Sequence, residues 1–173
     1  MIEVYDDFFP VDIHHQVFKK LSQRGWTFTG GGTSTGYDTK NYGQAPLSCF
    51  WHIDDLEKEE YFSKYLFDII CQNLNKSFAG YRRIYANGQT STQDGVPHVD
   101  DGDITLLYYP NLDWKVHYGG QLIFLDGDEI MKSVSYKPNR AVLFSSRIWH
   151  YAMAPSIQYP MLRMSLAYKL LLK

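Results

Sequence analysis

The second half of the chain consists of short segments in which apolar and polar side chains alternate, and this alternation is the strongest constraint on the fold. A period of two is typical of β-strands, and it predicts strands over Tyr81–Tyr85, Ile104–Tyr109, Gln121–Leu125, Val134–Tyr136, Ala141–Phe144 and Leu162–Lys169. Turn-forming dipeptides punctuate this half, namely Asn87-Gly88, Asp94-Gly95, Gly119-Gly120, Asp126-Gly127 and Pro138-Asn139. Many short strands separated in this way favour a mainly β fold, a sandwich or jelly roll.

The first half is predicted to be helical. Asp12 is placed to cap a helix that runs to about Arg24, and Asp54 or Asp55 can cap a second helix that ends near Asn75. The apolar faces comprise Ile13, Val17, Phe18 and Leu21 in the first helix, and Leu56, Tyr65, Leu66, Ile69, Ile70 and Leu74 in the second. We expect helical support over about residues 1–78, packed outside one sheet of a jelly-roll core over about residues 79–173.

A segment rich in Gly, Ser and Thr, residues 29–46, lies between the two predicted helices. A connection this long in a compact domain is either a lid or binding loop, or a disordered linker. Both interpretations stay open from the sequence.

The size and charge of the chain restrict its class. Its 173 residues suit one domain, 1–173. With 17 Lys and Arg against 19 Asp and Glu, the net charge of -2 gives no reason to expect nucleic acid or a membrane surface as partner. The two cysteines make no disulfide framework, no apolar stretch would span a bilayer, and the acidic start does not resemble a signal peptide. We therefore expect a soluble, cytoplasmic protein, monomeric or weakly dimeric.

The triplet His98-Val99-Asp100 is the first candidate for chemistry. In an extended segment, residues i and i+2 point to the same side, so His98 and Asp100 can face one metal ion. His150 follows the predicted strand Ala141–Phe144, and two imidazoles with one carboxylate form the facial triad of non-haem Fe(II) oxygenases. Such a triad leaves positions for a chelating keto acid and for O2. Taken singly, His98 could be a turn histidine, and His150 could simply pack among neighbouring aromatic residues.

The last predicted strand carries Arg163 and Ser165 on one face, and Leu162 and Met164 on the other. If the apolar face packs against helices, Arg163 and Ser165 point into the barrel. A buried arginine needs a partner, and the sequence assigns it no acidic residue. A carboxylate ligand would satisfy it in a bidentate pair, whereas an arginine on an edge strand would reach solvent instead.

A family resemblance rests on a series of short segments: Arg83-Ile84-Tyr85, Asn87-Gly88, His98-Val99-Asp100, Thr105 to Asn111, Gly119-Gly120-Gln121-Leu122, His150 and Arg163. Through them, about residues 80–170 resemble the prolyl-4-hydroxylase-like branch of the Fe(II)/2-oxoglutarate-dependent dioxygenases. The resemblance implies a double-stranded β-helix, which is a jelly roll, and an oxidoreductase that uses Fe(II), 2-oxoglutarate and O2, with ascorbate as a possible accessory.

The resemblance also implies roles for individual residues. His98, Asp100 and His150 would be the iron ligands, and Arg163 would hold the far carboxylate of 2-oxoglutarate; some collagen-type relatives use lysine there. The remaining residues of the co-substrate pocket would be Tyr85, Tyr109, Thr105, Leu107, Leu122 and Ser165. Tyr85 and Tyr109 could instead be ordinary core tyrosines, and Leu122 a core leucine.

The substrate side is less specific. The resemblance implies hydroxylation of a peptidyl proline with release of succinate and CO2. Arg147 is a candidate substrate contact, and Trp26 and Tyr42 could cover the substrate together with the lid candidate. Family members often carry an aromatic residue shortly before the first iron ligand, but residues 89–97 contain none.

Three other functions remain compatible with these residues. The same chemistry could act on a free amino acid or another small molecule. A cupin-like binding module could keep the fold without catalysis. A zinc hydrolase would also use two histidines and a carboxylate, but it usually needs a nearby general-base glutamate, as in HExxH, and the sequence has no such motif.

Overall fold

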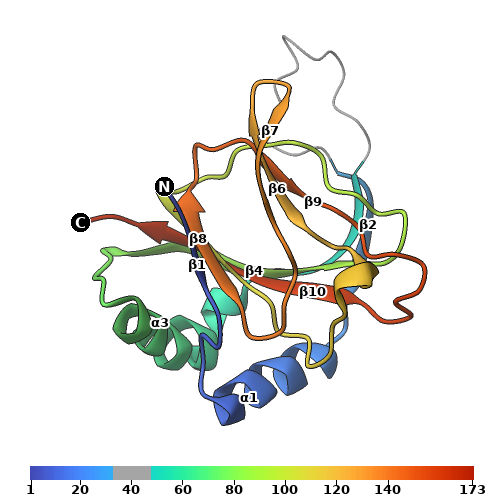
Figure 1. The fold of residues 1–173 in the computed structure, drawn as a ribbon. Coiled ribbons are helices and arrows are strands. Elements are labelled where there is room, and N and C mark those ends of the chain that lie inside the picture. The colour runs from blue at the N-terminus through green and yellow to red at the C-terminus, as the bar shows by residue number, and fades with distance from the viewer. Residues whose placement is uncertain (33–47) are drawn as a thin grey trace.

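A computed structural model describes residues 1–32 and 48–173. Its described strands form a seven-stranded antiparallel sheet, the major sheet, and a three-stranded sheet, the minor sheet (Figure 1). In spatial order the major sheet comprises β1 (Ile2–Tyr5), β8 (Ala141–Ser145), β5 (Ile104–Tyr108), β10 (Arg163–Leu171), β4 (Gly80–Gln89), β3 (Ser48–Ile53) and β2 (Thr27–Gly32). The minor sheet comprises β7 (Glu129–Val134), β6 (Leu122–Asp126) and β9 (His150–Ala152).

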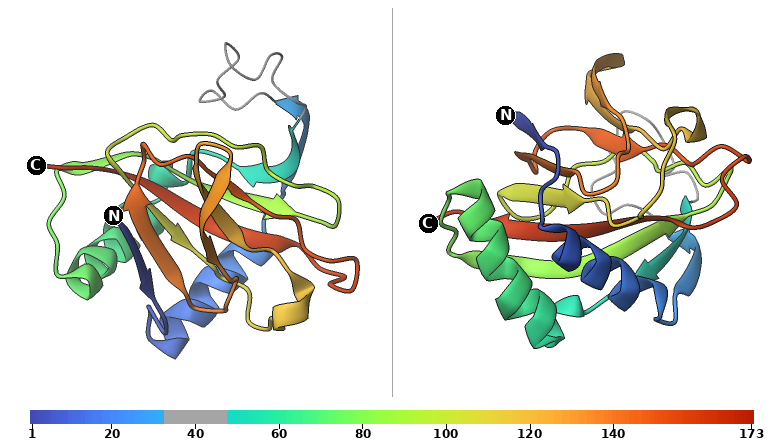
Figure 2. Two further views of the ribbon diagram at one scale, coloured as in Figure 1. Left: turned by 45° about the horizontal axis from the view of Figure 1, so that its top comes forward. Right: turned by 60° about the horizontal axis from the view of Figure 1, so that its bottom comes forward.

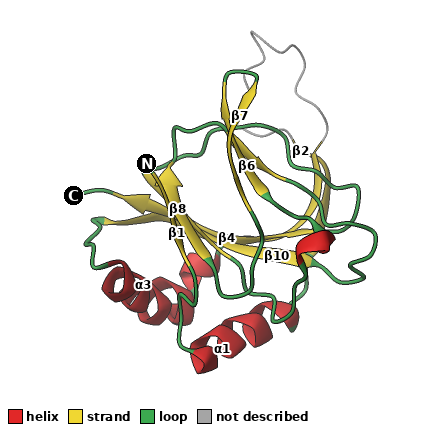
Figure 3. Cartoon of the chain, in the orientation of Figure 1, coloured by secondary structure: helices red, strands yellow, loops and turns green. Residues whose placement is uncertain are grey.

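Two helices cover the outer face of the major sheet, as the views in Figures 2 and 3 show. They are α1 (Val11–Ser22) and α3 (Phe67–Leu74), and η1 (Leu56–Lys58), η2 (Tyr61–Leu66) and η3 (Val116–Tyr118) are short 3₁₀ or π turns. None of the helices in the described part of the chain is long and apolar enough to cross a membrane.

Strand β10 separates two apolar cores, as its period of two predicts. Met164, Leu166 and Tyr168 point to the larger core beneath the helices. Ala167 points the other way, into the smaller core between the two sheets. Burying both faces explains why this strand lies at the centre of the sheet, between β4 and β5. The predicted jelly roll with helices outside one sheet is confirmed.

The helix starts differ from those expected. Helix α1 begins at Val11 after Pro10, and Asp12 lies inside its first turn rather than at the cap. Asp55 stands before η1 in a left-handed conformation, and its side chain makes no capping hydrogen bond. The second predicted helix is broken into η1, a π turn and α3, and it ends at Leu74, with Asn75 as the left-handed cap.

The first half is not wholly helical, because β2 and β3 form a hairpin that extends the major sheet beyond β4. The first residues of the predicted loop, 29–32, therefore belong to β2, and residues 33–46 of it lie outside the described part. The turn expected at Asn87-Gly88 is also wrong. Strand β4 runs through both residues because it pairs with β10 on one side and β3 on the other.

Most strands of the second half lie within two residues of their predicted ends. Strands β4 and β7 are the exceptions. Strand β4 ends at Gln89, four residues beyond the predicted end at Tyr85. Strand β7 occupies Glu129–Val134 instead of Val134–Tyr136, and it pairs with β6 across the Asp126-Gly127 turn. Strand β9 was not predicted, because its three residues are too few to show a period. It nevertheless carries His150 at its first position, so it places a candidate metal ligand.

Candidate metal centre and adjoining cavity

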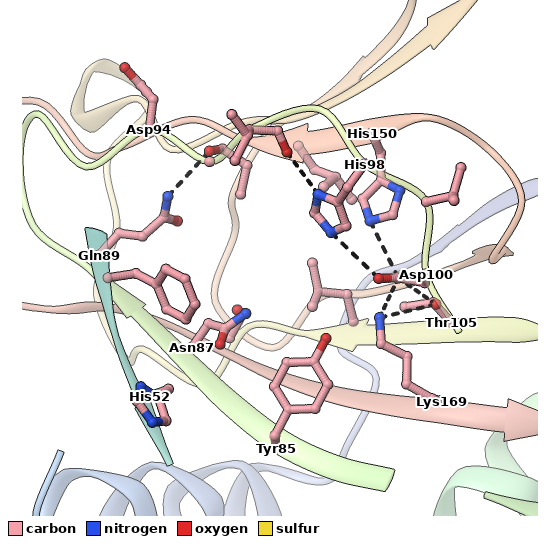
Figure 4. A pocket seen from close by; sticks show the side chains of 18 of the residues that line it. His52, Tyr85, Asn87, Gln89, Asp94, His98, Asp100, Thr105, His150 and Lys169 are labelled. Carbon is pink, nitrogen blue, oxygen red and sulfur yellow. Dashed lines mark hydrogen bonds and ion pairs between the residues drawn. The ribbon is translucent and has the colours of Figure 1, made fainter. Parts of the chain in front are cut away.

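Backbone pairing brings His98, Asp100 and His150 together. His98 lies in the extended segment after β4 and forms an isolated antiparallel bridge with His150, with N–H···O distances of 3.0 Å in both directions. The Asp100 N–H donates to the Ser146 carbonyl at 2.8 Å. As a result, the two imidazole rings lie 4.5 Å apart and the carboxylate lies beneath them (Figure 4).

Both histidines present an acceptor nitrogen to the same point. Each Nδ1 lies 2.8 Å from a backbone carbonyl two residues earlier, Val96 O for His98 and Ile148 O for His150. An Nδ1–H that donates to this carbonyl leaves Nε2 with its lone pair, the tautomer of a metal ligand. The two Nε2 atoms lie 3.4 and 3.3 Å from the carboxylate oxygens of Asp100, and the potential ligand atoms all fall within 4.8 Å of one another. Three converging acceptors form a candidate site for a metal cation.

The charge states of the buried residues suit metal binding. Burial alone would raise the pKa of Asp100, but Lys169 and the two histidines bring it well below its usual range. Burial lowers the pKa of His150, and hydrogen bonding to Asp100 only partly offsets it. The centre therefore offers a carboxylate and a neutral imidazole at neutral pH, the forms that coordinate metals.

Lys169 is a site residue that the sequence interpretation missed. It is 2% exposed, forms an ion pair with Asp100 Oδ2, and places Nζ 3.3 Å from Thr105 Oγ1 and 5.4 Å from the ring centre of Tyr85. The signal was present, because the face of β10 that begins with Arg163 and Ser165 continues at every second residue to Lys169.

A cavity of about 370 Å³ adjoins the centre. Five of the predicted co-substrate residues line it together with the triad, namely Tyr85, Thr105, Leu107, Leu122 and Ser165. Other lining residues include His52 on β3, Asn87 and Gln89 on β4, and Asp94 in the loop before His98 (Figure 4). Leu107 on β5 and Leu122 on β6 supply apolar parts of the wall, and the side toward β3 and β4 carries imidazole and amide groups.

Arg163 and Tyr109 lie just outside the wall of this cavity. Arg163 is 1% exposed, donates from Nε to Gly120 O at 3.0 Å and from Nη1 to Gln89 Oε1 at 2.8 Å, and contacts the faces of Tyr109 and Tyr136. Arg163 Nη2 and the Tyr109 hydroxyl are both buried without a hydrogen-bond partner. Burial lowers the pKa of Arg163, and it raises that of Tyr109 to about 12.

No acidic side chain in the described part of the chain pairs with Arg163. A guanidinium buried among tyrosines, with one nitrogen and a neighbouring hydroxyl unsatisfied, is costly unless an anion completes it. The donors fit a carboxylate, which accepts both a guanidinium N–H and a hydroxyl. Gln89 connects the cavity with the surroundings of Arg163, since it lines the cavity and accepts a hydrogen bond from Arg163.

Two of the three predicted substrate residues, Arg147 and Trp26, do not line the cavity. Arg147 is exposed and lines a separate hollow with residues such as Met1 and Gly127. Trp26 packs against the core beneath the helices, and its Nε1–H donates to Leu21 O at 3.1 Å. Sequence position alone suggested both residues, and it does not indicate on which side of the sheet a residue lies. Tyr42 lies outside the described residues.

Several solved structures share this fold. A Trichoplax adhaerens prolyl hydroxylase, in complex with a hypoxia-inducible factor peptide, is 18% identical at a TM-score of 0.68, with 98% of this chain and 83% of that chain covered. A Pseudomonas putida prolyl-4-hydroxylase is 15% identical at a TM-score of 0.67, with 99% and 92% covered. The epimerase SnoN from nogalamycin biosynthesis, in complex with Fe3+, alpha-ketoglutarate and nogalamycin RO, is 10% identical at 0.66, with 99% and 78% covered.

Comparisons with protein-family models and with curated protein sequences give no match. The structural likeness therefore carries the assignment of the fold. The chain has the jelly-roll fold of the 2-oxoglutarate-Fe(II) oxygenases, and it places a His-Asp-His cluster inside that fold.

Proposed function

We propose that this protein is an Fe(II)- and 2-oxoglutarate-dependent oxygenase that hydroxylates an unactivated C–H bond, with a prolyl residue of a peptide or protein as substrate. The observation that carries the proposal is that one barrel contains both a cluster of metal-ligand atoms and a buried arginine. His98, Asp100 and His150 bring three potential ligand atoms together, and Arg163 is buried without an acidic partner among the described residues.

The residues present fit both groups. His98, Asp100 and His150 would hold iron, because two imidazoles and one carboxylate are the facial ligand set of non-haem Fe(II). The far carboxylate of 2-oxoglutarate would satisfy Arg163 Nη2 and the Tyr109 hydroxyl. Bound iron and 2-oxoglutarate would supply the oxidising power that protein side chains lack, with succinate and CO2 as products.

The remaining residues of the cavity would position the reactants and exclude water. Leu107, Leu122 and Phe144 form an apolar wall beside the metal centre, which keeps solvent from the reacting carbon. The Tyr85 hydroxyl points from β4 toward the centre, where it can donate to a carboxylate of the co-substrate (Figure 4). Arg163 is held rigidly by Gly120 and Gln89, so it can orient the co-substrate without losing much side-chain entropy.

The likeness to two prolyl hydroxylases, one of them solved with a peptide, supports a peptidyl proline as substrate. The likeness to SnoN supports a second candidate, a small molecule, because that epimerase is solved with nogalamycin RO at a similar TM-score. In either case the substrate would enter on the side of β3 and the loop before His98, where His52 and Asp94 line the cavity.

Anaerobic calorimetry with Fe(II) and then 2-oxoglutarate tests the cofactor assignment. The wild type should bind 2-oxoglutarate in the presence of Fe(II), and Arg163→Ala should bind it at least about tenfold more weakly. Arg147→Ala is the matched control, since it removes the same charge from an exposed position outside the cavity. Equal affinity in the wild type and Arg163→Ala would exclude Arg163 as the carboxylate anchor.

Turnover then separates the substrate classes. Succinate formed together with a proline-containing peptide that gains one oxygen atom would support the prolyl substrate. Succinate coupled only to small molecules would retain the enzyme class and refute the peptide. Tight 2-oxoglutarate binding without succinate from either panel would point to a non-catalytic binding module.

A further inference from the structure

Asp100 is held asymmetrically by its neighbours. Its Oδ2 accepts a hydrogen bond from Thr105 Oγ1 at 2.7 Å and forms the ion pair with Lys169. Its Oδ1 has no contact with Thr105 or Lys169 of this type, and its polar neighbour is His98 Nε2 at 3.4 Å. The two oxygens of the carboxylate are therefore not equivalent, although both lie near a histidine.

Among the residues that the structure describes, Asp100 is the acidic partner of Lys169. The next carboxylate along the chain, Asp101, is taken by Arg82 at 3.2 Å and Arg83 at 2.9 Å on the surface. Lys169 lies in the middle of the sheet, opposite Arg83 on β4 and Thr105 on β5, and it is almost fully buried. An ammonium group in this position stabilises the fold only while it stays paired, so its place beside Asp100 is strongly determined.

We propose that Lys169 is a positioning residue that makes Asp100 a one-oxygen ligand. The Lys169 ammonium and the Thr105 hydroxyl occupy Oδ2, and Asp100 offers Oδ1 to the metal ion. This inference rests on the proposed function, because its purpose is to keep coordination positions free. A carboxylate that bound through both oxygens would take a second position, and fewer would remain for the two donor atoms of a keto acid and for O2.

Lys169 has two opposing effects on metal affinity, one from its charge and one from its orientation of Asp100. Removing an ammonium beside the centre increases the attraction of the site for a divalent cation, whereas losing the orientation of Asp100 weakens the site. Metal affinity alone therefore does not reveal the role. The number of coordination positions open to solvent does reveal it, and so does the affinity for a chelating anion.

The test uses the chain of 173 residues loaded with Mn(II). The water molecules bound to Mn(II) are counted by electron paramagnetic resonance in ¹⁷O-enriched water. The wild type should hold three exchangeable waters, one for each position that a facial triad leaves open. Lys169→Met keeps the aliphatic stem without the charge. This variant should hold two exchangeable waters on Mn(II), and it should bind 2-oxoglutarate about tenfold more weakly. Lys132→Met, on the exposed strand β7, is the matched control and should hold three.

Three waters in Lys169→Met, with 2-oxoglutarate affinity unchanged, would overturn the proposal. If that variant does not fold, Thr105→Val decides, because it removes the hydroxyl that donates to Oδ2 and keeps the charge of Lys169. A water count between two and three in Thr105→Val supports the proposal, and an unchanged count refutes it. A wild type that fails to bind Mn(II) or 2-oxoglutarate would contradict the proposed function itself, which is a distinct result from any behaviour of the variants.

Discussion

His98 and His150 are joined through their backbones before any metal ion is considered, because each donates its N–H to the carbonyl of the other at 3.0 Å. The bridge positions both imidazoles, and the carbonyls of Val96 and Ile148 orient the rings. The ligand geometry is thus preorganised by main-chain hydrogen bonds, and binding a metal ion need not reorganise the protein.

Loss of one imidazole should strongly weaken metal binding. Replacing His150 with Ala removes one of three ligands from a buried centre, and we expect the affinity for Mn(II) to fall at least about a hundredfold, measured by calorimetry. The same change at His117, which is exposed, should leave the affinity unchanged. In the wild type, Mn(II) at a hundred times its dissociation constant should stabilise the fold by about 2.7 kcal/mol, and no such gain should occur in His150→Ala.

Tyr109→Phe should stabilise the ligand-free protein and weaken its binding of 2-oxoglutarate. The Tyr109 hydroxyl is buried without a partner, so its removal should raise the free energy of unfolding of the ligand-free protein by about 1 kcal/mol. The same variant should bind 2-oxoglutarate more weakly, since the hydroxyl is proposed to donate to the carboxylate.

Tyr136→Phe is the matched comparison. The Tyr136 hydroxyl already donates to Met164 O at 2.7 Å, so its loss should destabilise the protein by about 1 to 2 kcal/mol. Urea titrations of both variants measure whether the free energy of unfolding rises in Tyr109→Phe and falls in Tyr136→Phe. A loss of stability in Tyr109→Phe equal to that in Tyr136→Phe would show that the Tyr109 hydroxyl has a partner after all.

Gly120→Ala should displace Arg163. Gly120 has φ +73°, and an added Cβ would lie 2.9 Å from Arg163 Nε and 2.9 Å from Trp114 Cζ2. We expect 2-oxoglutarate binding to weaken at least about tenfold, because the guanidinium cannot keep its position. Gly127→Ala shares the left-handed conformation, at φ +58°, but meets nothing within 4 Å. It should cost about 1 kcal/mol of stability and leave co-substrate affinity unchanged.

Acid should weaken the fold through His14. This side chain is 6% exposed against Tyr108, and burial lowers its pKa from 6.5 to about 4. The unfolded chain therefore takes up a proton at a higher pH than the folded one, and stability falls as the pH drops from 6.5 toward 4. The loss attributable to His14 is up to about 3 kcal/mol.

Urea titrations at several pH values between 7 and 4.5 measure this slope in the wild type, His14→Gln and His15→Gln. His150 titrates in the same direction, but it is present in all three proteins, so the difference in slope isolates His14. We expect a flatter profile for His14→Gln and a profile close to the wild type for His15→Gln, which changes an exposed residue. Parallel profiles for all three would contradict the prediction. Asp6 contributes only in stronger acid, because its hydrogen bond from Arg140 lowers its pKa to about 2.

Local sequence rules failed where tertiary pairing outweighed them. Asn87-Gly88 is a strong turn signal, yet two neighbouring strands hold it extended, and Gly88 leaves room for Leu162, which an added Cβ would meet at 2.5 Å. Asp12 has the chemistry of a helix cap, but the helix begins at Val11 with Pro10 in the cap position, two residues earlier than expected.

The sequence by itself determined the jelly roll and the candidate ligand set. Alternation along β10 separates Arg163 and Ser165 from Met164 and Leu166, and the i, i+2 spacing puts His98 and Asp100 on one side, because side-chain direction in a strand follows from its period. Only the tertiary structure decided which side chains contact one another in the site. Lys169 meets Asp100, and Arg163 meets Gln89 and Gly120, through the register between strands distant in sequence. Periodicity tells which face a side chain occupies, whereas its contacts depend on the whole sheet.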